Sequence, residues 1–143
     1  MADFCDNFEN VIRSVSAITD RIGENAACKV FPDMQDQRAT GKYIVYAEAG
    51  GDSDEHLTAS SGIAHTVLQV WSFGDTRREA NELAEILRRE LKARNNEYWG
   101  TQYVTEVSCS AHRDSGIDPA QDRQSKPKYW TRRTFDIWHS EVV

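Results

Sequence analysis

Cysteine is scarce in this chain and is not arranged for a disulfide framework or a zinc site. The 143 residues include three cysteines, Cys5, Cys28 and Cys109, which lie far apart and form no C-x-x-C pair. A disulfide framework needs an even number of cysteines, and a structural zinc site usually needs cysteines in closely spaced pairs. We therefore expect free thiols in a reducing cytoplasm.

Long apolar runs are also missing. No stretch approaches the roughly 20 apolar residues that a membrane-spanning helix requires. The residues that follow Met1 have neither the basic start nor the apolar centre of a secretion signal. We expect a soluble protein that is not exported and that contacts no membrane.

The sequence lacks the common motifs for binding phosphate or metal. Neither G-x-x-x-x-G-K-[ST] nor G-x-G-x-x-G occurs, so the usual backbone cradles for nucleotides are absent. The four histidines, His56, His65, His112 and His139, show no H-x-x-x-H or H-x-H spacing. We expect neither a metal nor a cofactor.

An enzymatic function remains as the less favoured alternative. It would be a small hydrolase or thiol enzyme that uses His65 or Cys109, because an imidazole can activate a nearby thiol. No serine lies in a G-x-S-x-G elbow. A cysteine within a strand is usually a small buried hydrophobe, so we expect no catalytic activity.

Basic residues are outnumbered, which argues against general nucleic-acid binding. The chain has 17 Lys and Arg against 23 Asp and Glu, a formal net charge of -6. Residues 1–60 hold 11 acidic and 5 basic side chains and so carry the whole excess. Binding to phosphates needs a clustered Lys and Arg surface, which this balance does not favour.

One basic and aromatic cluster does occur late in the chain. The basic residues Lys126, Lys128, Arg132 and Arg133 are interleaved with Tyr129 and Trp130. This pattern is known from proteins that bind single-stranded nucleic acid. On an alternating strand, however, Arg132 and Arg133 point to opposite faces. Arginine and aromatic residues are also enriched in protein interfaces, so a subunit interface is the favoured interpretation.

Hydrophobic periodicity predicts two helices. Apolar residues recur at steps of three and four over residues 8–22, and again after Thr76. Thr76 and Glu79 have the spacing of a capping box, in which each side chain satisfies a backbone N–H of the other residue. Asn95 and Asn96 are expected to end the second helix.

Strands are predicted at residues 28–32, 43–46, 65–73, 103–107 and 129–138, from β-branched and aromatic content. The last shows a two-residue alternation. Residues 50–62 and 112–128 are polar and predicted to be loops, longer than simple connectors. This order predicts one α+β domain over residues 1–143, an antiparallel sheet with two helices packed on one face.

Several segments, taken in order, resemble the tail completion (tail terminator) family of tailed phages. The likeness covers about residues 11–139. The segments are Val30-Phe31-Pro32-Asp33, Tyr43-Ile44-Val45-Tyr46, Leu57 with Ser61-Gly62, Val67-Leu68-Gln69-Val70-Trp71-Ser72, Arg78-Glu79-Ala80 with Leu83-Ala84, and Arg132, Arg133, Phe135, Asp136, Ile137 and Trp138.

The resemblance implies a structural protein of the virion, assembled in the host cytoplasm and placed at the head–tail junction. Its subunits, similar to lambda-like tail terminators, would form a hexameric ring that caps the tail tube and ends its polymerisation. The ring would join the tail tube protein to the head connector, and DNA would pass through it without specific binding. A head-completion or connector protein of the same virion is the alternative.

Two sets of residues are candidates for contacts in such a ring. Asp52, Asp54 and Glu55 form an acidic stretch that we expect to face the lumen or the tube, because acidic side chains do not bind the phosphates of passing DNA. The expected interface residues are Trp99, Trp130, Trp138, Arg132 and Arg133. For the tryptophans, core packing is the alternative.

Overall fold

The computed structural model describes residues 4–23, 30–32, 41–50, 53–55, 60–110, 114–118 and 127–140. There the chain forms three helices and one eight-stranded, mostly antiparallel sheet, so the fold is mixed α/β. The helices are α1 (Phe4–Ser14), α2 (Ser16–Ile22) and α3 (Arg77–Lys92). The strands are β1 (Val30–Pro32), β2 (Tyr43–Gly50), β3 (Ser53–Glu55), β4 (Ser60–Gly74), β5 (Glu97–Trp99), β6 (Gln102–Cys109), β7 (Asp114–Asp118) and β8 (Lys128–Ser140). Within these ranges, no helix is long and apolar enough to cross a membrane.

Two long strands in the middle of the sheet join all the others. β4 and β8 pair antiparallel over twelve residues, from Ile63 opposite Ser140 to Gly74 opposite Tyr129. The strand order is β1-β2-β4-β8-β6-β5, with β3 beside β4 and β7 beside β8. Among the described strands, β1 and β2 form the parallel pair. The sheet therefore consists of two groups of strands that meet at the β4–β8 pair.

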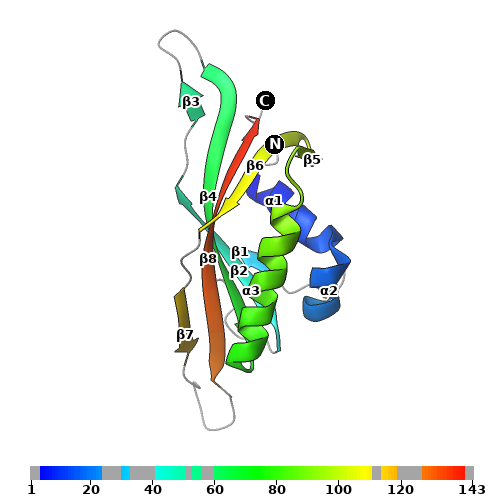
Figure 1. The fold of residues 1–143 in the computed structure, drawn as a ribbon, viewed down its shortest axis with the longest axis vertical. Helices are drawn as coiled ribbons and strands as arrows, with labels where there is room; N and C mark the ends of the chain where they lie inside the picture. The colour runs from blue at the N-terminus through cyan, green and yellow to red at the C-terminus, as the bar shows by residue number, and fades with distance from the viewer. Residues whose placement is uncertain are drawn as a thin grey trace.

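The partners of this central pair are arranged with approximate two-fold symmetry. β2 pairs with the C-terminal half of β4, and β3 pairs with its N-terminal half. β6 and β7 pair with the corresponding halves of β8. The two halves of the chain thus build similar bent hairpins. Figure 1 shows β3 and β7 at opposite ends of the same side of the molecule.

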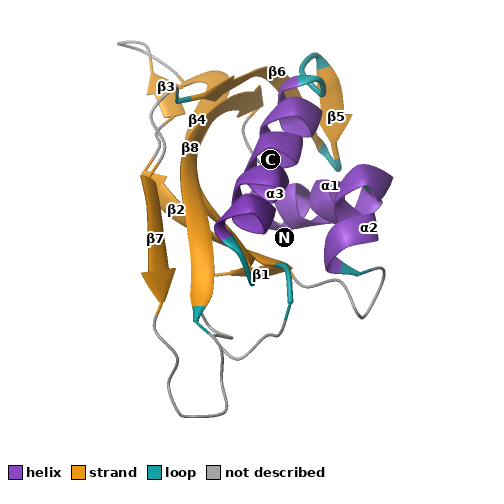
Figure 2. Ribbon diagram, turned by 60° about the horizontal axis from the view of Figure 1, so that its bottom comes forward, coloured by secondary structure: helices purple, strands orange, loops and turns teal. Residues whose placement is uncertain are grey.

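All three helices lie on one side of the sheet, as Figures 1 and 2 show. The capping box predicted at the start of α3 is confirmed, because Thr76 Oγ1 accepts from the Glu79 backbone and the Glu79 carboxylate accepts from the Thr76 backbone. A buried apolar stripe of α3 packs on β4 and β8. The stripe consists of Ala80, Leu83, Ala84, Leu87 and Leu91.

The N-terminal segment forms two helices where one was predicted, so the prediction of two helices in all is wrong. Val15 has extended backbone angles, φ -95° and ψ 110°, and separates α1 from α2. Its side chain is buried and joins Ile12 and Ile18 in the core. The predicted apolar face is confirmed, because Phe8, Ile12, Ile18 and Ile22 are buried. A single extended residue keeps the side chains facing the sheet, and hydrophobic periodicity alone does not reveal it.

The two long predicted loops contain strands. β3 and the first residues of β4 lie within residues 50–62, and β7 lies within residues 112–128. These segments are rich in Gly, Ser and Asp, which have low strand propensity. Backbone pairing along β4 and β8 overrides this local preference, since each central strand extends beyond β2 or β6 and leaves an edge for a further partner.

A polar network closes the core beneath α1. His139 Nε2 and Thr66 Oγ1 lie 2.8 Å apart, and His139 Nδ1 lies 2.7 Å from the Ser140 carbonyl oxygen. Since a carbonyl oxygen only accepts, Nδ1 carries the proton and Nε2 accepts from Thr66. Phe4 stacks on the imidazole with 4.0 Å between ring centroids. Burial in this site lowers the pKa of His139.

The same network attaches α1 to the β5–β6 turn. Asn7 Nδ2 donates to Gln102 Oε1 at 2.7 Å, and Gln102 Nε2 donates to the Ser140 carbonyl at 3.1 Å. Gly100 forms the turn with φ +65°, and a Cβ there would lie 2.1 Å from Asn7 Oδ1. A left-handed conformation and this close approach both require glycine at position 100.

We expect the stability of the fold to decrease as the pH falls from about 7 towards 5, in part through His139. Because folding lowers the pKa of His139 from its ordinary value of 6.5, the unfolded chain binds the proton more readily. The contribution of the neutral imidazole is therefore complete above that value and is lost as the pH falls below it. Urea unfolding at several pH values measures this loss.

The variant His139→Gln should be less stable than the parent chain at pH 7.5 but should lose less stability between pH 7.5 and 5.5. His65→Gln is the comparison variant: His65 lies on the other face of the sheet and makes only a lesser contribution to the lowered pKa of His139, so this variant should keep most of the pH dependence. An identical pH dependence in the parent chain and in His139→Gln would contradict the assignment.

Candidate functional site

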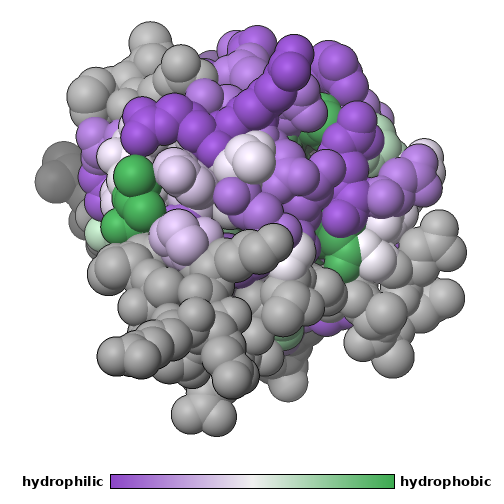
Figure 3. Space-filling model, turned by 90° about the horizontal axis from the view of Figure 1, so that it is seen from below, coloured by the Kyte–Doolittle hydropathy of each residue, from purple (hydrophilic) through white to green (hydrophobic). Residues whose placement is uncertain are grey.

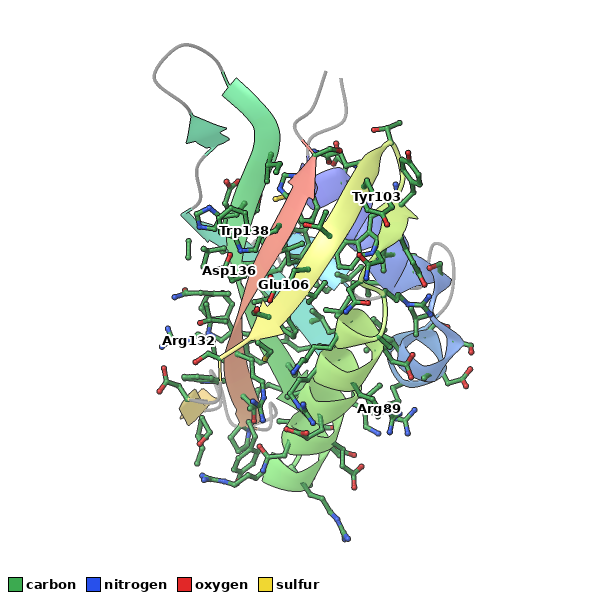
Figure 4. All side chains as sticks on the ribbon, turned by 45° about the horizontal axis from the view of Figure 1, so that its top comes forward. Arg89, Tyr103, Glu106, Arg132, Asp136 and Trp138 are labelled. Atoms are coloured by element: carbon green, nitrogen blue, oxygen red, sulfur yellow. The ribbon has the colours of Figure 1, made fainter. Side chains whose placement is uncertain are left out.

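The outer face of the sheet, away from the helices, is the candidate site. Residues of β4 and β8 alternate, so that Leu68, Val70, Phe135 and Ile137 are buried towards the helices. The residues between them face outward and are partly exposed. The alternation predicted for residues 129–138 is thus confirmed. We call this surface the outer face; its main side chains are His65, Trp71, Trp130, Arg132, Asp136 and Trp138, and Figure 4 labels three of them along β8.

One end of the outer face is occupied by the chain's own contacts. The guanidinium of Arg132 lies over the ring of Trp71, 5.9 Å from its centroid, and it also pairs with the Asp114 carboxylate of β7. Beside it, Trp130 covers Gly116, where a Cβ would lie 2.4 Å from the indole. A cation held between a carboxylate and an aromatic face is favourable. This end therefore carries a complete set of partners.

The other end combines an aromatic ring with two carboxylates. Trp138 stacks on His65 with 4.5 Å between ring centroids, and His65 Nε2 lies 3.8 Å from Asp136 Oδ1. That oxygen is buried and makes no hydrogen bond. Glu106 of β6 lies directly opposite Trp138. Among the described residues, neither Asp136 nor Glu106 forms an ion pair with Lys or Arg.

The two ends correspond to each other through the symmetry of the central pair. Trp71 lies opposite Arg132, and His65 lies opposite Trp138. Each tryptophan thus faces a nitrogen-containing side chain across the β4–β8 ladder. At one end that side chain is a permanently charged guanidinium, and at the other it is an imidazole.

The predicted pair of arginines is divided between the two faces of the sheet. Arg132 lies on the outer face, whereas Arg133 points to the helices and pairs with Glu85 of α3. Burial tends to raise the pKa of Glu85, but Arg88 and Arg133 outweigh it and lower that pKa. Arg133 has a side chain only 11% exposed, so it connects α3 to the sheet and offers little surface to a partner.

Trp99, another predicted interface residue, lies in the core. Its side chain is 1% exposed and stacks on Phe4 with 5.8 Å between centroids. The indole Nε1 donates to the Arg94 carbonyl at 3.0 Å. The core role, which the sequence left open, therefore accounts for this residue. Trp130 and Trp138 are partly exposed on the outer face and remain interface candidates.

The side chains of the predicted acidic residues, Asp52, Asp54 and Glu55, are not described in the structure. Asp52 lies outside the described residues, and Asp54 and Glu55 lie in β3, where only the backbone is described. Their pairing places this segment beside the first residues of β4. The expectation that these carboxylates face a lumen or a tube stays a prediction.

The enzymatic alternative depends on Cys109 and His65, and both side chains make contacts within the fold. Cys109 is half-buried, and burial raises the pKa of its thiol in spite of the nearby Arg133. A raised pKa leaves less of the reactive thiolate. His65 stacks on Trp138, and no described serine or cysteine side chain hydrogen-bonds to it. Over the described ranges, no three His, Cys, Asp or Glu side chains are grouped to hold a metal ion.

Sequence reasoning missed Trp71, Asp114 and Glu106 as parts of this surface. Trp71 and Arg132 are 61 positions apart, and their pairing depends on the β4–β8 register. Asp114 was assigned to a loop because its neighbours are polar. Only the alternation within residues 65–73 contained a usable signal, since it places Trp71 and His65 on one face.

The core and interface candidates should respond differently to truncation. We expect Trp99→Ala to lower the free energy of unfolding by about 3–5 kcal/mol, as for other buried aromatic residues. Trp138→Ala should lower it by about 1 kcal/mol or less, because its ring is partly exposed. Urea denaturation followed by circular dichroism measures both. Equal losses would contradict the placement of Trp99 in the core.

No protein-family model matches this chain, and no curated protein matches it at a significant level.

Proposed function

We propose that this protein is a structural subunit of a phage tail terminator ring, without enzymatic activity. In this role about six copies close a ring at the head-proximal end of the tail. The ring caps the tail tube, ends its polymerisation and joins the tail to the head connector. The proposal rests on the ordered resemblance over about residues 11–139 and on the outer face of the sheet.

The outer face is the observation that carries the proposal. The helices lie on one side of the sheet (Figure 2). On the other side, Trp71 and Trp130 pack on the buried Tyr43, Val45 and Phe73, whereas the end at Trp138 is partly exposed. Here that side carries Trp138 together with Asp136 and Glu106. Aromatic residues are enriched at interfaces, where each buries a large area with few rotatable bonds. The described residues on this face thus favour docking over catalysis.

The described surface at the end of the molecule where β8 begins is mainly hydrophilic. Figure 3 views the molecule from that end and shows hydrophobic residues only in small, separate patches on the coloured surface. Ile117 of β7 is one exposed apolar side chain, and Tyr98 of β5 is another elsewhere. Contacts between copies would therefore depend on charged and aromatic groups more than on a large apolar area.

The acidic segment fits a ring through which DNA passes. Asp54 and Glu55 would add negative charge near the lumen or the tube, in keeping with the formal net charge of -6. These carboxylates would repel the negatively charged phosphates of the DNA, so the duplex would slide through without being bound. A head-completion or connector protein of the same virion would have similar needs, and the position of the protein in the particle separates the two roles.

The mass of the purified protein in solution tests the proposal. We expect light scattering to give a species near six times 16.3 kDa at high protein concentration, and negative-stain electron microscopy to show rings with a central opening. A protein that stays monomeric at every accessible concentration, with no ring in the images, would contradict it. Hydrolysis of a generic ester or thioester that is lost in Cys109→Ala or His65→Ala would favour the enzymatic alternative.

A further inference from the structure

The occupied end of the outer face shows how this surface holds a cation. Arg132 is placed above Trp71 and pairs with Asp114, so its guanidinium meets an aromatic face and a carboxylate together. Guanidinium groups suit such sites because they are planar, always charged and weakly hydrated. The other end has the same components around Trp138, with Asp136 and Glu106 as the carboxylates.

At the Trp138 end, no Lys or Arg among the described residues pairs with the two carboxylates. Asp136 Oδ1 is buried without a hydrogen bond, and the His65 imidazole lies 3.8 Å from it. Glu106 is exposed and accepts only from Ser108 Oγ at 3.4 Å among the described contacts. An unpaired carboxylate oxygen that is shielded from water is unfavourable, so an incoming donor would stabilise this end of the face.

A suitable cation lies on the opposite side of the molecule. Arg89 projects from the last turn of α3 with a side chain 67% exposed, and its ion pair with Glu90 is long at 3.6 Å. Lys92 follows it in the same basic turn. Figure 4 shows Arg89 on the helix layer, away from Asp136, Glu106 and Trp138. The basic turn and the acidic aromatic site cannot meet within one chain.

We infer that Arg89 of one copy docks on the Trp138, Asp136 and Glu106 site of the next copy. The inference rests on the proposed ring, because it names the partner for its outer face. A ring with one repeated contact needs two different and complementary surfaces on each subunit. Here they are a basic helix turn and an acidic sheet face on opposite sides of the sheet. The guanidinium lies against the indole and pairs with the carboxylates, as Arg132 does with Trp71 and Asp114.

Charge reversal on either side of this contact tests the inference. We expect Arg89→Glu, and separately the double variant Glu106→Lys with Asp136→Lys, to raise the protein concentration needed for ring assembly at least about tenfold, because attraction becomes repulsion at every contact. Arg78→Glu is the matched control. It makes the same change on α3, but eleven residues away, roughly 16 Å along the helix and beyond the screening length of salt.

Mixing the two assembly-deficient proteins gives the decisive measurement. In an alternating ring, the glutamate introduced in the first variant would meet the lysines introduced in the second, and Arg89 of the second would meet the original carboxylates of the first. Light scattering should therefore show that the equimolar mixture assembles although neither variant does alone. Circular dichroism first checks that each variant is folded. With folded variants, rescue supports the inference and its absence contradicts it.

The inference and the proposed function can fail separately. If the unmodified protein forms rings and all three variants assemble as it does, the ring stands and the Arg89 contact is wrong. If the unmodified protein forms no ring at any concentration, the proposed function itself fails, and the contact fails with it.

Discussion

The antiparallel pairing of β4 with β8 is the interaction on which the rest of the structure depends. It joins two bent hairpins into one sheet and supplies the surface on which α3 packs. Its register also decides what meets on each face. A slip of one residue would turn every side chain of β8 over, so that Arg132 would face the helices and Arg133 the solvent. Both the core and the outer face therefore follow from one set of backbone hydrogen bonds.

Local patterns predicted the elements whose cause is local. The capping box of Thr76 and Glu79 marks the start of α3 because both partners lie within one turn. The alternation in β8 separates Arg132 from Arg133 for the same reason. β3 and β7 were missed because their pairing partners, not their own residues, make them strands. The break at Val15 was missed because the side chains on either side of it still face one core.

The outer face was only half predictable from the sequence. Trp130, Trp138 and Arg132 could be assigned to it by alternation, but their partners come from distant segments. Trp99 illustrates the opposite error, since nothing in its neighbourhood shows that Phe4, at the far end of the chain, will cover it. Burial of this kind depends on tertiary packing, which composition and spacing do not encode. The same holds for Cys109, whose pKa depends on surroundings that only the fold brings together.

The separation of β4 and β8 along the chain has a consequence for biosynthesis. Residues 60–74 leave the ribosome long before residues 128–140, so β4 can form a hairpin with β2 while its other edge has no partner. An unpaired edge of this length can pair with any similar strand, including one on another nascent copy. The time needed to synthesise α3 and β6 is then a window in which chaperone binding or slow translation would affect the yield of correctly paired chains.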